Sequence, residues 1–116
     1  MSTRCNIIIK REGYNDIILY HHHDGYPQGV GYYLHSRLKK IKGWWYECDI
    51  ANNLVKDTKD EYEITSCIHG DIDYLYTIDC DAKQLKCNRM HYNIEKHTQE
   101  IGKEEKMNFE QNGELK

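Results

Sequence analysis

The chain has 116 residues, 39% hydrophobic and 30% charged, with a formal net charge of −3 at pH 7. This length suits one domain and is too short for two. The chain has no run of about 18 apolar residues that could span a membrane. Its negative charge argues against a broad DNA-binding face. The amino terminus lacks the apolar stretch of a signal peptide and the five cysteines include no CxxC pair, so we expect a cytoplasmic protein with reduced thiols.

The first part of the chain predicts a β-hairpin. Residues 4–11 and 17–23 are rich in isoleucine and read as two strands. Residues 12–16 between them contain the glycine, asparagine and aspartate typical of a turn. The second strand leads into residues 24–31, DGYPQGVG, which read as a glycine-rich loop.

Two helices are expected after this loop. The first is indicated by apolar residues at spacings of four, four and three, which place one face against a core: Val30, Leu34, Leu38 and Ile41. Gly43 is expected to end it. The second helix is expected from another apolar stripe: Trp44, Cys48, Ala51 and Val55.

The rest of the domain predicts a three-stranded antiparallel meander, formed by residues 61–68, 72–79 and 84–92. The side chains expected to share a face on each strand are Tyr62, Ile64, Ser66 and Ile68; Ile72, Tyr74, Tyr76 and Ile78; and Leu85 and Cys87. The domain is expected to span residues 1–102, followed by a polar tail at 103–116.

This order of elements predicts an α+β fold: an antiparallel sheet of about five strands (hairpin, two helices, three-stranded meander) with the helices on one face. The other face would then be open, and an open face rich in tyrosine suits a ligand or a second copy of the chain. We therefore expect a homo-oligomer.

The stretch HHHDGYPQGVG is the strongest candidate for a site. Because side chains alternate along a strand, His22 is expected on the same face as Tyr20 and Asp24, and His21 and His23 on the opposite face. The glycines allow close approach of the backbone, and the unpaired N–H groups of a helix that begins near the proline would bind phosphate or carboxylate. We favour an anion-binding loop slightly over an ordinary strand-to-helix corner.

Metal binding and catalysis are weaker alternatives. His21 and His23 with His69, Asp71 or Cys67 would be one possible set of metal ligands, and a second set is Cys80, Cys87 and His91. Neither has the paired short spacings of a zinc site, so we expect no metal and no cofactor. His22 beside Asp24 would form a base and its orienting group, and Ser2 an amino-terminal nucleophile, but no nucleophile motif accompanies them.

Two stretches of the sequence, MSTRCNIIIK and YHHHDGYPQGVG, are similar to motifs of a family of small bacteriophage and prophage proteins, and the later GDIDYLYTID also fits. The resemblance covers roughly the first third of the chain and one later strand. It implies a viral accessory protein that acts in the infected bacterial cell. Such proteins often counter host defence, either by blocking immune effectors or by removing nucleotide signals.

Three functions follow as hypotheses. The first is a non-catalytic binder that sequesters a nucleotide-like immune signal, the second a direct protein inhibitor of a CRISPR or other immune effector, and the third a small phosphodiesterase or hydrolase. The partner is accordingly a nucleotide-like small molecule or a host immune effector protein. The candidate ligand-binding residues are Arg4, Asn6, Tyr20, His22, Asp24, Gly25, Tyr26, Gly29 and Gly31.

Overall fold

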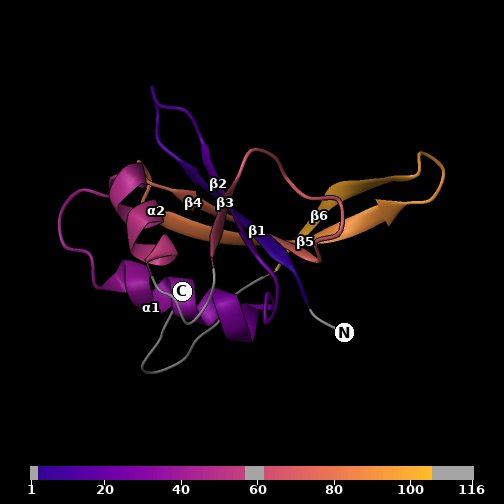
Figure 1. The fold of residues 1–116 in the computed structure, drawn as a ribbon, viewed down its shortest axis with the longest axis horizontal. Coiled ribbons are helices and arrows are strands. Elements are labelled where there is room, and N and C mark those ends of the chain that lie inside the picture. The colour runs from indigo at the N-terminus through magenta and orange to yellow at the C-terminus, as the bar shows by residue number, and fades with distance from the viewer. Residues whose placement is uncertain (1–2, 57–61, 106–116) are drawn as a thin grey trace.

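A computed structural model describes residues 3–56 and 62–105, which form a mixed α+β fold with one six-stranded sheet and two α-helices (Figure 1). A π-helical turn, Pro27–Gly31, leads directly into the first α-helix. The elements in chain order are β1 (Cys5–Lys10), β2 (Ile17–His21), α1 (Tyr32–Lys39), α2 (Glu47–Val55), β3 (Glu63–Thr65), β4 (Tyr74–Asp79), β5 (Gln84–Asn93) and β6 (Thr98–Glu105).

The sheet, with the strand order β3-β2-β1-β4-β5-β6, differs from the expected one in three respects. The third strand pairs with β2 rather than β4, and β1 and β4 run parallel, so the sheet is not wholly antiparallel. It also has a sixth strand, β6, which pairs with β5. The predicted β1–β2 hairpin is confirmed. Because five of the six β1 residues are buried, β1 suits a central strand with a neighbour on each side.

The connection from β3 to β4, residues 66–73, crosses one face of the sheet. Asn6 is fully buried there: its side-chain Nδ2 donates to the Leu19 carbonyl at 2.8 Å, and its Oδ1 accepts from the His69 N–H at 2.7 Å. The His69 ring stacks on Tyr20, with 4.0 Å between ring centroids. Ile72 is fully buried on this side, in a small cluster with Ile8, Tyr20 and Leu75. The expectation that Ile72 shares a face with Tyr76 and Ile78 is therefore wrong.

The main core contains buried side chains from β1, from both helices and from β4. The predicted stripe of the first helix is confirmed for Val30, Leu34 and Leu38, although α1 ends at Lys39 and leaves Ile41 outside it. The stripe predicted for the second helix is wrong except at Ala51. The helix begins only at Glu47, and it buries the side chains Glu47, Ile50, Ala51 and Leu54.

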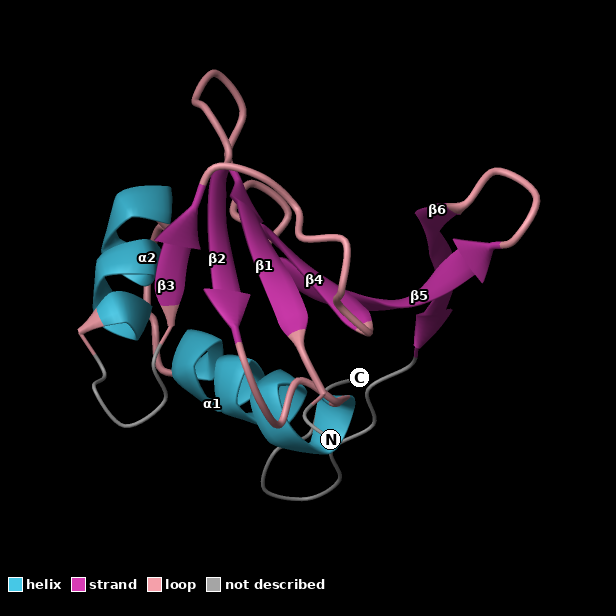
Figure 2. Cartoon of the chain, turned by 45° about the vertical axis from the view of Figure 1, so that its right-hand side comes forward, coloured by secondary structure: helices cyan, strands magenta, loops and turns pink. Residues whose placement is uncertain are grey.

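The β5–β6 hairpin projects from the body of the molecule (Figure 2). Because β6 continues to Glu105, the first three residues of the expected tail belong to the sheet, and residues 106–116 lie outside the described part. The β6 edge carries a register irregularity and several charged side chains, and β3 at the other edge has three residues. Short, charged or bulged edges discourage pairing with other chains. The homo-oligomer remains a prediction.

Within the described residues, no helix is both long enough and apolar enough to cross a membrane.

Candidate functional site

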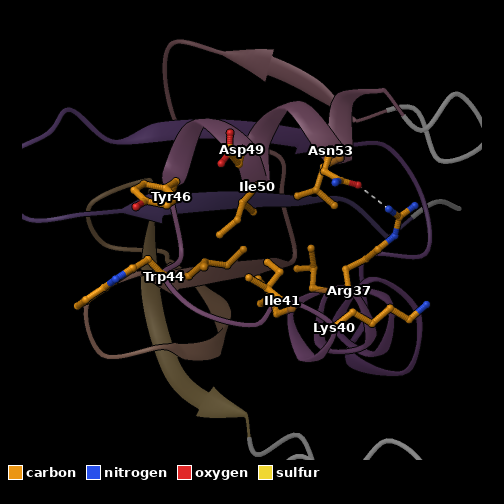
Figure 3. Close-up of a pocket in the computed structure, with 12 residues that line it drawn as sticks. Arg37, Lys40, Ile41, Trp44, Tyr46, Asp49, Ile50 and Asn53 are labelled. Atoms are coloured by element: carbon orange, nitrogen blue, oxygen red, sulfur yellow. Dashed lines mark hydrogen bonds between the residues drawn. The ribbon is translucent and has the colours of Figure 1, made fainter.

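A pocket of about 310 Å³ lies between α1 and α2 and is lined in part by the segment that joins them (Figure 3). This volume is at the lower end of the range for small-molecule sites. Its floor is apolar, formed by leucine and isoleucine side chains from both helices and by Ile78 of β4. The polar and aromatic lining residues are Arg37, Lys40, Trp44, Tyr46, Asp49 and Asn53.

The two ends of the pocket differ in chemistry (Figure 3). Arg37 and Lys40, from the end of α1, lie at one end. The Arg37 Nη1 donates to Asn53 Oδ1 at 2.7 Å, a bond that joins α1 to α2 and fixes the guanidinium. The Lys40 side chain is exposed and forms no ion pair with any residue that the structure describes. This end of the pocket is suited to an anion.

Trp44 and Tyr46 lie at the other end (Figure 3). Trp44 is 78% exposed and Tyr46 is 44% exposed, both unusual for aromatic side chains of this size. Exposed aromatic rings beside an apolar pocket offer flat surfaces for stacking. The pocket therefore combines an aromatic end, an apolar floor and a cationic end.

The loop predicted to bind an anion forms a compact corner. The Gly25 N–H donates to the Thr3 carbonyl at 3.0 Å, the Gly29 N–H to the Tyr26 carbonyl at 2.9 Å, and the Val30 N–H to the Asp24 carbonyl at 2.8 Å. These three donors are occupied within the protein and do not point to a ligand.

The glycines of the corner have packing roles. A Cβ at Gly29 would overlap the Asp24 carbonyl oxygen, and a Cβ at Gly25 would lie 3.0 Å from atoms of residues 3–5. The hydroxyl of Tyr76, a residue of β4, donates to the Gly25 carbonyl at 2.7 Å. Asp24 has a positive φ of 53°, and the Tyr26 hydroxyl donates to its carboxylate at 3.3 Å. Gly31, the last residue of the π-helical turn, is buried.

The other predicted site residues lie on the face crossed by residues 66–73. Besides Asn6 and Tyr20, described above, Arg4 pairs with Asp71 at 3.7 Å, and the His22 Nε2 lies 2.7 Å from a carboxylate oxygen of Glu63. As predicted, the His22 ring contacts Tyr20, and the rings of His21 and His23 contact each other on the opposite side. The predicted grouping of Asp24 with His22 is wrong, because an Asp24 carboxylate oxygen lies 3.6 Å from the Nδ1 of His23. Arg4, Asn6 and Tyr20 thus contact the crossing segment, whereas residues 24–31 form a corner that packs against residues 3–5.

The postulated metal ligands are not brought together. His69 stacks on Tyr20, so it lies across the sheet from His21 and His23. Among the residues that the structure describes, no three His, Cys, Asp or Glu side chains form a metal-binding group. Burial raises the pKa of Cys80 to about 11 and that of Cys87 to about 12, so both remain thiols at neutral pH. Ser2 lies outside the described residues.

The pocket residues were missed by the sequence reasoning. Arg37 and Lys40 lie at the end of a helix, where basic residues are common, and Trp44 was expected in a buried stripe. The signal that was present is the aromatic run at 44–46, which comes shortly after this basic group. No protein-family model matches the chain, and no curated protein or solved structure shows significant similarity to it.

Proposed function

We propose that the protein is a non-catalytic binder of a nucleotide-like small molecule and that the pocket between α1 and α2 is its binding site. One observation carries the proposal: a cationic end with Arg37 and Lys40 and an aromatic end with Trp44 and Tyr46 share one apolar pocket. A nucleotide has the matching chemistry, since its base stacks on aromatic rings and its phosphate pairs with cations. A volume of about 310 Å³ suits a single nucleotide unit.

We further infer that both helices cover the same sheet face, because their buried side chains share one cluster with Ile7 and Ile9. This arrangement supports a pocket with a rigid floor, since Ile78 of β4 reaches it from the sheet. In the infected cell, a binder of this kind would withhold a nucleotide-like signal from host defence. That biological role is supported by the resemblance of the amino-terminal motifs to small phage proteins.

Calorimetric titration with AMP tests the binding site. Lys40→Ala should weaken binding about fivefold and Trp44→Ala about tenfold, because stacking on one aromatic side chain contributes roughly 1–3 kcal/mol. Lys42→Ala and Tyr92→Ala are matched controls, since both residues are exposed and neither lines the pocket. They should change the affinity less than about twofold. Absence of AMP binding, or equal weakening by the controls, would contradict the proposal.

Native mass spectrometry with a panel of cyclic oligonucleotides and ADP-ribose isomers distinguishes a binder from an enzyme. Recovery of intact ligand after denaturation is the expected result. Recovery of a processed product would instead support the small hydrolase, in which His22 or Asp24 would be candidates for catalysis.

Direct inhibition of an immune effector protein is a second candidate, favoured by the projecting β5–β6 hairpin. Tyr92, Ile94 and Ile101 on this hairpin are 53%, 75% and 58% exposed. Large exposed apolar side chains that gather on one element often mark protein interfaces. If this hairpin is the functional surface, Ile94→Asp should abolish activity against the host while the affinity for AMP stays unchanged.

A further inference from the structure

A group of contacts centred on Arg11 reaches the pocket from the β1–β2 turn. The Arg11 Nη1 donates to both carboxylate oxygens of Glu47, at 3.2 and 3.4 Å. Its guanidinium carbon lies 4.1 Å from the centroid of the Tyr14 ring and 5.0 Å from that of the Tyr46 ring. Arg11 is thus held by one carboxylate and contacts two aromatic rings, one of which lines the pocket.

Glu47 lies at the start of α2 and is buried. It is the first residue of the helix and is only 4% exposed, and a buried carboxylate requires a partner to offset its lost hydration. Arg11 supplies this partner from the hairpin, 36 residues earlier in the chain. The ion pair therefore anchors the start of α2 to the end of β1.

Tyr46 immediately precedes α2 and has an extended backbone, with φ −105° and ψ 128°. The Tyr46 side chain is 44% exposed, so the protein covers only part of it. The Arg11 guanidinium provides a flat surface against it, and a flat cation over a tyrosine ring is attractive.

We propose that Arg11 is a positioning residue that holds the Tyr46 ring at the aromatic end of the pocket, ready for a ring-bearing ligand to stack on it. This inference rests on the proposed function of the pocket. A lysine would keep the charge and could still pair with Glu47, but its ammonium has no planar face. Arg11→Lys therefore separates the effect on Tyr46 from the loss of the ion pair.

The test compares two ligands, AMP and ribose 5-phosphate, which has the sugar and phosphate but no base. In Arg11→Lys, the affinity for AMP should fall about fivefold, whereas that for ribose 5-phosphate should change less than twofold. Arg89→Lys is the matched control, because the Arg89 guanidinium carbon lies 5.7 Å from the Tyr74 ring centroid and Arg89 does not line the pocket. It should affect neither ligand. Equal weakening of both ligands in Arg11→Lys would indicate general structural damage and overturn the proposal.

A second measurement needs no ligand. The NMR signals of a selectively labelled Tyr46 ring should shift in Arg11→Lys and stay unchanged in Arg89→Lys. Unchanged Tyr46 signals in Arg11→Lys would overturn the positioning role, whatever the titrations show. If wild-type protein fails to bind AMP while the Tyr46 signals do shift, the proposed function fails and the structural role of Arg11 is supported.

Discussion

The corner at residues 24–31 and the pocket between α1 and α2 both gather polar groups, but they use them differently. In the corner, the N–H groups of Gly25, Gly29 and Val30 all donate to protein carbonyls. In the pocket, Lys40 and Trp44 are exposed beside a hollow with an apolar floor. The contrast shows that polar groups of a glycine- and histidine-rich motif can be occupied by hydrogen bonds that form a turn. Polar and aromatic groups that are available to a ligand are instead exposed side chains that border a pocket.

The largest expected effect comes from a glycine of the corner. Gly29→Val should destabilise the protein by roughly 3 kcal/mol, because its Cβ would overlap the Asp24 carbonyl and the backbone must move. Urea denaturation measures this change. Gly70→Ala is the control, since a Cβ at Gly70 has no atom of the described structure within 4 Å. A Gly29→Val protein that keeps its stability but loses AMP binding would return the site to the corner.

Asn6→Ala should lower the free energy of unfolding by somewhat less, roughly 2–3 kcal/mol. The change leaves the Leu19 carbonyl and the His69 N–H without their side-chain partner in a buried place, and each unsatisfied group costs about 1–3 kcal/mol. Asn88→Ala is a milder comparison, because the partly buried Asn88 side chain forms one bond, to the Gly102 carbonyl. Equal losses in the two variants would show that Asn6 does not anchor the crossing segment.

Alkaline pH should weaken the support beneath the corner. The Tyr76 hydroxyl donates to the Gly25 carbonyl, and Cys87 lies next to Tyr76. Burial raises the pKa of Cys87 from 9.0 to about 12, so the unfolded chain loses this proton first. The contribution of the Cys87 thiol to the free energy of unfolding is complete below pH 9. It is lost as the pH rises toward 12, by at most about 1.4 kcal/mol per pH unit.

Denaturation curves at pH 8 and pH 10 measure this loss, and Cys87→Ala should show a smaller one. An identical pH dependence in the variant would rule out Cys87 as the cause.

How far the sequence predicts this fold can be seen in single elements. Alternation and turn residues correctly predict the β1–β2 hairpin, and they place His22 and His23 on opposite sides of the strand. Alternation does not specify which strands become neighbours, so the parallel β1–β4 pair was missed. The α2 stripe was wrong because the helix begins at Glu47, whose buried carboxylate pairs with Arg11, a residue distant in sequence.

The candidate site was harder to predict than the fold. Basic residues near the end of a helix already have an explanation in the helix dipole, so Arg37 and Lys40 gave no separate signal. The exposure of Trp44 depends on where α2 begins, which was predicted too early. The pocket arises from the packing of two helices, and local patterns in either helix do not contain that information.

The smallest expected effect comes from Arg4 and His22, which the sequence suggested as ligand-binding residues. The Arg4–Asp71 and His22–Glu63 pairs are about half exposed, and pairs of this kind contribute roughly 0–1 kcal/mol to stability. Arg4→Ala and His22→Ala should therefore fold normally. If the ligand binds between α1 and α2, both variants should also keep the wild-type affinity for AMP within about twofold, because neither residue lines the pocket. Titration of these two variants beside Trp44→Ala decides between the regions. Loss of binding in His22→Ala with full binding in Trp44→Ala would place the site on the face crossed by residues 66–73, where an anion would compete with Glu63 for His22.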